Sequence, residues 1–209
     1  ILVEKPVSTT TEYLKKFKSR YNKNVIVAYN RRHYPSIAEA KKFIENSKGS
    51  LLCRMNLPEI VINTGNKKNN FEKIFENSAH GIDILYYLFG TLKIIHISKI
   101  NLRSFDSSRV VIFKAMKKHT CILTINSNSP SNFSLELEDG YKRMLIEPFE
   151  KYELYQGMNI VAPKNKYPVR RYSPTLIESK NIFNFDQKYI DLKPGFYKQT
   201  LEFLNYIKN

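Results

Sequence analysis

The first six residues constrain the fold more than any other part of the sequence. Ile1, Leu2 and Val3 are consecutive apolar residues, and the polar turn Glu4-Lys5-Pro6 follows at once. A short apolar run that ends abruptly is typical of a strand buried inside a parallel sheet. We therefore expect the chain to begin inside an α/β sheet whose other strands precede it. Residue 1 is Ile rather than Met, which favours a chain that lacks an upstream segment.

Helix and strand patterns continue up to residue 62. Thr9 and Glu12 have the spacing of a capping box, and the apolar stripe behind them predicts a helix. Residues 25–29 form a second continuously apolar strand, and Pro35 suits the first turn of a second helix. Residues 51–62 read as one or two strands. This part resembles the tail of a doubly wound nucleotide-binding fold.

The second half of the sequence has a different pattern. A helix is predicted over 71–89, and Gly90 ends it. Short segments with partial alternation then run from residue 91 to residue 155, with a turn signal at Asp139-Gly140, as in an antiparallel meander. Three prolines make 163–190 look irregular, and a final helix follows Pro194-Gly195.

The predicted fold class is therefore α+β. An open, mostly antiparallel sheet with helices on one face is preceded by the last β-α-β piece of a Rossmann-like fold. We expect residues 1–34 to be the residual end of a dinucleotide-binding domain with its linker. Residues 35–209 would form a C-terminal substrate-binding and oligomerisation domain.

Composition excludes several classes of protein. The two cysteines are too few for a disulfide framework, so we expect reduced core residues in a cytosolic protein. No apolar run is long enough to span a bilayer, and no signal-peptide pattern is present. The net charge of +15 comes from lysines spread along the whole chain, without a recognisable nucleic-acid motif. We expect neither a membrane partner nor a nucleic-acid partner, although basic residues could steer an anionic substrate.

Two places in the sequence could carry chemistry. Glu76, His80 and Asp83 are spaced i, i+4, i+7 and should share one helix face, where carboxylates could tune the histidine as a general base. A buried, hydrogen-bonded structural histidine explains the same spacing, and spacing alone favours it. Lys5 follows a buried strand at the sheet edge where α/β folds bind ligands. An ordinary cation at a strand end also explains Lys5, and Lys5 taken alone favours that explanation. No metal-ligand spacing is present.

Four short motifs, taken together and in order, resemble the Gfo/Idh/MocA family of NAD(P)-dependent oxidoreductases. They are Glu4-Lys5-Pro6, the segment from Asn30 to Pro35, the His80-x-x-Asp83 helix, and the closing segment from Lys193 to Gln199. The resemblance covers nearly the whole chain. Tyr29–Arg32 and Asn77–His80 are most similar to members from bacterial surface-polysaccharide and nonulosonic-acid gene clusters.

The resemblance implies a site for hydride transfer with a sugar or nucleotide sugar. Lys5 would hold the reacting hydroxyl and the nicotinamide ribose, with Glu4 and Pro6 beside it, and His80 would be the general acid/base. Arg31 and Arg32 would contact an anionic group of the substrate, although a solvated strand end accounts for them equally well. Glu76 stands where the family has an Asp, and Asp83 would orient and pack. Oligomers would form through residues 91–160.

One part of the family pattern is missing from the sequence. The family binds the pyrophosphate of NAD or NADP with a Gly-x-Gly-x-x-Gly turn, but the seven glycines of this chain are too far apart to form one. We expect no dinucleotide binding by this chain alone. Three explanations stay open: a cut chain, a split or decayed gene, or a domain that works as a separate subunit. The alternative function is a non-catalytic sugar-binding or oligomerising module.

Overall fold

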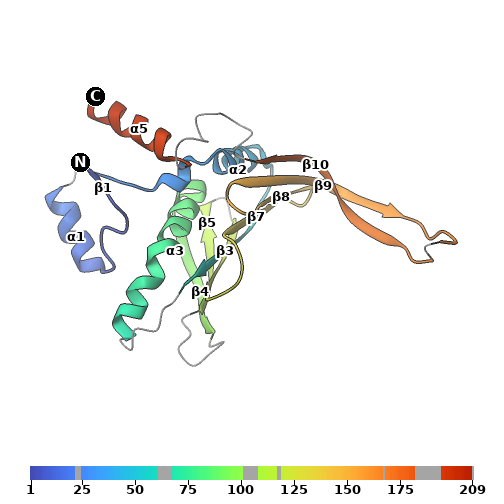
Figure 1. Cartoon of the computed structure of the whole chain (residues 1–209), viewed down its shortest axis with the longest axis horizontal. Coiled ribbons are helices and arrows are strands. Elements are labelled where there is room, and N and C mark those ends of the chain that lie inside the picture. Colours follow the sequence, from blue (N-terminus) through green and yellow to red (C-terminus); the bar gives the residue numbers. More distant parts are fainter. Residues whose placement is uncertain are drawn as a thin grey trace.

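The computed structural model describes residues 1–21, 25–60, 67–100, 108–116, 119–166, 168–181 and 194–208, with side chains of the helix at 67–89 described from Ser78 onward. Three parts are visible in Figure 1. A small α/β unit and the C-terminal helix lie on one side, a large sheet with two helices forms the centre, and a hairpin projects from the other side.

The small unit at the N-terminus is the predicted β-α-β piece. Strands β1 (Leu2–Val3) and β2 (Ile26–Val27) are parallel, and helix α1 (Thr11–Arg20) lies between them in the chain. The predicted capping box is wrong. The N-cap is Thr10, not Thr9, so the Thr-x-x-Glu spacing does not start at the cap, and no side chain caps the helix. Instead Ser8 Oγ accepts a hydrogen bond of 3.0 Å from the Thr10 amide.

Eight strands form the large sheet in the order β10-β9-β8-β7-β3-β6-β5-β4. Only β3 and β6 are parallel to each other, and every other neighbouring pair is antiparallel. The strands are β3 (Leu52–Glu59), β4 (Leu92–Ile100), β5 (Ser108–Ala115), β6 (Thr120–Ser127), β7 (Ser134–Glu138), β8 (Lys142–Ile146), β9 (Lys151–Val161) and β10 (Arg171–Asn181).

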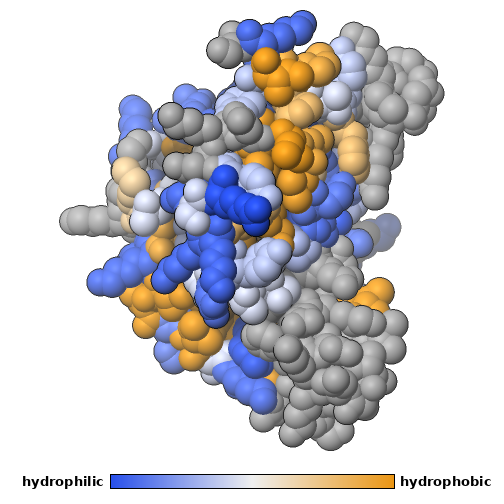
Figure 2. Space-filling view, turned by 90° about the vertical axis from the view of Figure 1, so that its left-hand side faces the viewer, coloured by the Kyte–Doolittle hydropathy of each residue, from blue (hydrophilic) through white to orange (hydrophobic). Residues whose placement is uncertain are grey.

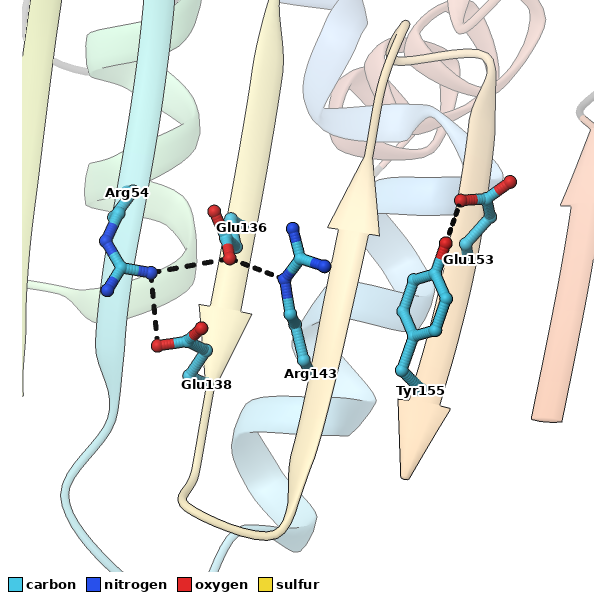
Figure 3. A network of polar contacts seen from close by, with 6 residues as sticks. All are labelled: Arg54, Glu136, Glu138, Arg143, Glu153 and Tyr155. Atoms are coloured by element: carbon cyan, nitrogen blue, oxygen red, sulfur yellow. Dashed lines mark hydrogen bonds and ion pairs between the residues drawn. The ribbon is translucent and has the colours of Figure 1, made fainter. Parts of the chain in front are cut away.

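Alternation along the strands gives the sheet one covered face and one open face. In β3, Cys53, Met55 and Leu57 are buried while Arg54 between them is exposed, as a strand of period two requires. Helices α2 (Pro35–Asn46) and α3 (Lys67–Phe89) cover the buried face, and Ile37, Ala40, Ile84 and Leu85 close the core. Figure 3 shows the open face, with the helices behind the sheet. This is the predicted fold class.

The structure differs from the sequence-based prediction in the start of one helix and in one additional strand. Helix α3 begins at Lys67 rather than at residue 71. Residues 171–181, predicted to be irregular, form the eleven-residue strand β10. Pro174 is tolerated because β10 is the edge strand, where one side of the backbone needs no partner, and the pairing register shifts on either side of Leu176.

The chain ends in helix α5 (Phe196–Lys208), which begins after Pro194-Gly195 as predicted. In the part of the chain that the structure describes, no helix is long and apolar enough to cross a membrane.

Candidate functional site

A short 3-10 helix, η1 (Asn30–His33), connects the two units and contacts helices α2, α3 and α5. It follows β2 directly and ends where Pro35 begins α2, because proline fits the first turn of a helix. The Asn30-Arg31-Arg32 motif therefore lies where three parts meet: the small unit, helix α3, which carries His80 and Asp83, and the C-terminal helix α5.

An ion pair fastens η1 to α3. Arg32 donates two hydrogen bonds to the Asp83 carboxylate, one of them 2.9 Å from Nε to Oδ2. The guanidinium also lies over the rings of Tyr29 and Tyr87, 5.6 and 5.5 Å from their centroids. A bidentate Arg–carboxylate contact with aromatic stacking fixes the orientation of η1 on α3 as well as pairing the two charges.

Burial shapes the acid–base behaviour of this cluster. Burial raises the pKa of Asp83, and the hydrogen bond from Arg32 only partly offsets it. Burial disfavours the charged Arg32 guanidinium, but the hydrogen bond and negative charge of Asp83 leave its pKa raised. The pKa of Tyr29 is raised by burial and then by the charge of Asp83. The site is thus a desolvated ion pair covered by aromatic rings.

His80 lies one helical turn before Asp83 and faces the same junction. Its side chain is buried, and its ring meets the edge of Tyr29 with centroids 6.0 Å apart at 81°. The next residue, Gly81, lets α3 approach β3 closely, since a Cβ there would lie 2.4 Å from a methyl of Leu57. The predicted His80-x-x-Asp83 face is therefore packed against Tyr29 and Arg32.

A groove of about 390 Å³ runs between the Pro6–Thr11 segment and α3. Pro6, Tyr29 and Asp83 line it, together with the polar segment from Ser8 to Thr11. The Lys5–Pro6 peptide bond is cis, and Lys5 is half-buried beside the groove. The volume of the groove is at the lower end of the range for small-molecule sites.

Several predicted site residues lie elsewhere or outside the described part. Glu4 is exposed. Arg31 turns to the large domain, with its guanidinium 4.4 Å from the centroid of Phe133. The Glu76 side chain and Lys193 lie outside the described residues. A second hollow of about 760 Å³, between α2 and β9, contains none of the predicted site residues.

Sequence reasoning missed Glu59, a buried carboxylate at the end of β3. It accepts a hydrogen bond from the Ser78 amide, two residues before His80. One signal was present: Glu59 continues the alternation of Cys53, Met55 and Leu57, which places it on the covered face.

Asn30, the first residue of the second motif, joins that motif to the closing segment. Asn30 Nδ2 donates a 3.0 Å hydrogen bond to the carbonyl of Pro194. Gly195 follows with φ +81°, and a Cβ there would lie 2.0 Å from the Asn30 carbonyl oxygen. Gln199, in the first turn of α5, is buried at the same junction. Among the described residues, no group of three His, Cys, Asp or Glu side chains could hold a metal ion.

No family model matches the sequence, and no curated protein matches it. Solved structures do match the fold. A dehydrogenase (MviM) from Clostridium difficile is 17% identical with a TM-score of 0.65, covering 100% of this chain and 62% of its own. Levoglucosan dehydrogenase in complex with NADH and levoglucosan is 16% identical with a TM-score of 0.60, covering 84% of this chain and 54% of its own.

A putative oxidoreductase from Thermotoga maritima is 18% identical with a TM-score of 0.57, covering 99% of this chain and 68% of its own. These likenesses show the fold that the sequence motifs imply. The chain spans between about half and two thirds of the length of these proteins.

Proposed function

We propose that this chain is the substrate-side part of an NAD(P)-dependent oxidoreductase of the Gfo/Idh/MocA family. One observation carries the proposal: three motif regions far apart in the sequence converge on one groove, which Pro6, Tyr29 and Asp83 line. The fold likeness to a dehydrogenase (MviM) and to levoglucosan dehydrogenase supports it. The substrate would be a sugar or nucleotide sugar, and the motifs at Tyr29–Arg32 and Asn77–His80 favour a cytoplasmic role in polysaccharide biosynthesis.

The residues of this chain fit the sugar but not the whole cofactor. The groove is about the size of a small polar ligand and has the polar Ser8–Thr11 segment along one side. No closely spaced glycines are present to hold a pyrophosphate. We therefore propose that a Rossmann domain, in cis or in trans, completes the site against residues 1–34. Residues 35–209 would form the substrate-binding and oligomerisation domain.

When bound, the nicotinamide accepts or donates the hydride. The residues of this chain would bind the substrate hydroxyl and move its proton. Lys5 would hold the reacting hydroxyl oxygen, and His80 would take or return its proton. Asp83 and Arg32 would hold η1 on α3, so that Tyr29 and His80 keep a fixed relation. The resemblance also proposes Arg31 as a contact for an anionic group of the substrate; because its guanidinium lies over Phe133 outside the groove, such a substrate would have to reach beyond the groove.

The intact mass of the protein purified from cells is measured first, to identify its longest form. Lys5→Ala and His80→Ala are then made in that form to test these roles. We expect each substitution to lower turnover by about 100-fold or more, the usual contribution of a positioned acid or base. Lys42→Ala, on the exposed side of α2, is the matched control. If both site variants retain normal turnover with the true substrate, the assignment of Lys5 and His80 is wrong.

A non-catalytic sugar-binding or oligomerising module is the second candidate, because the sequence lacks the cofactor turn. It predicts that NADH fluorescence stays unchanged even when upstream sequence is restored. A shift or quenching of that fluorescence by the longer protein would rule it out.

We also propose that the open face of the sheet binds a second copy of the chain. Glu136 and Glu138 lie between Arg54 and Arg143 there, with Arg54 Nη1 3.1 Å from Glu138 Oε2 and Arg143 Nε 2.6 Å from Glu136 Oε1 (Figure 3). A surface that carries both signs of charge can complement itself about a two-fold axis. Sedimentation of Arg143→Glu tests this, because reversing one charge should weaken a homodimer.

A further inference from the structure

The hairpin formed by β9 and β10 extends well beyond the sheet (Figure 1). The last residue of β9 that pairs with β8 is Gln156, opposite Lys142. Beyond it, β9 pairs only with β10, through Met158 opposite Pro174 and Ile160 opposite Tyr172. We call residues 157–174 the arm.

The arm has one apolar face. Residues directly opposite each other in an antiparallel pair share a face, and successive residues alternate between faces. Met158, Ile160, Tyr172 and Pro174 therefore lie on one side of the ribbon. Asn159, Val161, Arg171 and Ser173 lie on the other side. Met158, Ile160 and Tyr172 are 54%, 58% and 60% exposed, so the described residues leave this face uncovered.

The arm is also strongly basic. No acidic residue occurs between Glu153 and Glu178, whereas Lys164, Lys166, Arg170 and Arg171 all fall within this stretch. All four are exposed, close to the end of the hairpin, and Val169 beside them is 64% exposed. An exposed apolar face next to clustered cations needs a partner that is apolar beneath and negatively charged at its surface.

We propose that the arm docks on the surface of an anionic phospholipid bilayer. The apolar face would enter the boundary between headgroups and acyl chains, while Lys164, Lys166 and Arg170 near the end of the hairpin meet the lipid phosphates and Arg171, on the opposite face, adds to the attraction at longer range. A second copy of the arm fits less well, because it would bring four further cations against the first four. Nucleic acid would use the cations but gain little from Met158 and Ile160. The sequence led us to expect no membrane partner, because the amphipathic register appears only once β10 is paired with β9.

Flotation with lipid vesicles tests the proposal. The protein should float with vesicles that contain phosphatidylglycerol and remain behind with pure phosphatidylcholine. Replacing Lys164, Lys166, Arg170 and Arg171 by serine should weaken binding about 100-fold or more, since each cation near such a surface contributes about fivefold. The matched control replaces Lys15, Lys16, Lys18 and Arg20 by serine, which removes the same charge from exposed positions on α1. It should bind nearly as well as the parent chain.

A fluorescent reporter tests the depth of the arm. The chain contains no tryptophan, so Tyr172→Trp introduces a single probe on the apolar face. Its emission should shift to the blue with anionic vesicles, whereas Tyr13→Trp on α1 should not shift. Circular dichroism of each variant checks that it is folded.

Three outcomes would overturn the proposal. Equal loss of binding in the α1 control would mean that net charge, not the arm, causes the attraction. Binding of an oligonucleotide through the four arm cations, without vesicle binding, would make the arm a nucleic-acid site. Loss of self-association in Ile160→Ser/Tyr172→Ser, again without vesicle binding, would make it an interface between copies.

Discussion

Gly195 shows how a single residue sets the position of a whole helix. Its φ of +81° is costly for any residue with a Cβ, and the Asn30 carbonyl oxygen occupies the space that a Cβ would need. Because Asn30 Nδ2 also donates a hydrogen bond to the Pro194 carbonyl, η1 and the start of α5 are fixed to each other by two neighbouring contacts.

Gly195→Ala should therefore destabilise the protein more than Gly140→Ala. Both glycines have positive φ, but a Cβ at Gly140 would meet nothing within 4 Å. We expect a loss of about 1–2 kcal/mol in the free energy of unfolding for Gly140→Ala, from backbone strain alone. Gly195→Ala should lose at least about 2 kcal/mol more from the steric contact. Urea unfolding of both variants measures the difference, and equal losses would show that the Asn30 contact relaxes easily.

His33 makes the same junction sensitive to pH. Burial lowers its pKa from the ordinary value of 6.5, although Glu202 on α5 lies 3.5 Å from Nδ1 and partly offsets this. The unfolded chain then binds a proton at a higher pH than the folded chain does. Stability from His33 is present above the unfolded pKa and is lost as the pH falls below about 6.5.

Thermal unfolding at a series of pH values tests this assignment. Between about pH 7.5 and pH 5.5 the parent protein should lose more stability than His33→Gln, which cannot titrate. Identical pH profiles for the two proteins would show that the histidine stays accessible to protons when folded.

At the scale of secondary-structure elements, η1 organises the site because it contacts three helices at once. Its contact with α3 rests on the Arg32–Asp83 pair, in which the Asp83 side chain is only 9% exposed. Removing one partner of a desolvated pair leaves the other charge without compensation, which costs more than the pair itself contributes.

Asp83→Ala should lower the free energy of unfolding by about 2–3 kcal/mol. The control is Lys42→Ala, which breaks the exposed Glu39–Lys42 pair on α2 and should change stability by less than about 0.5 kcal/mol. A double replacement of Arg32 and Asp83 by leucine should restore part of the loss, because no charge is then left buried. Chemical denaturation of the three variants measures these differences in the free energy of unfolding. Similar values for Asp83→Ala and Lys42→Ala would mean that water solvates Arg32 freely.

At the scale of the whole molecule, apolar surface remains on the side of α1 and α5. Figure 2 views this side and shows hydrophobic residues among hydrophilic ones. Exposed apolar side chains come from both elements: Tyr13 and Leu14 on α1, and Leu201, Leu204 and Ile207 on α5. Under the proposed function, the cofactor domain would cover this surface.

We expect the chain by itself to self-associate through this side. Leu201→Ser/Leu204→Ser should shift sedimentation toward the monomer, because it removes exposed apolar area from α5. Lys198→Ser, on the same helix, serves as control. A parent chain that stays monomeric at high concentration would contradict the expectation.

The sequence by itself determined the local structure and its order. Continuous apolar runs predicted β1 and β2, the helical pattern ending at Gly90 predicted α3, and alternation predicted the sheet. These signals are local, because a helix or strand face is fixed by residues a few positions apart. The roles of Lys5, His80 and Arg31 stay predictions.

Only the tertiary structure decided which side chains meet. It joined Arg32 to Asp83 and Asn30 to Pro194, and it buried Glu59 against Ser78. It also made residues 171–181 an edge strand despite Pro174, since pairing with β9 outweighs local propensity. Contacts between residues 51 or 164 positions apart depend on how the elements pack, and no short stretch of sequence contains that information.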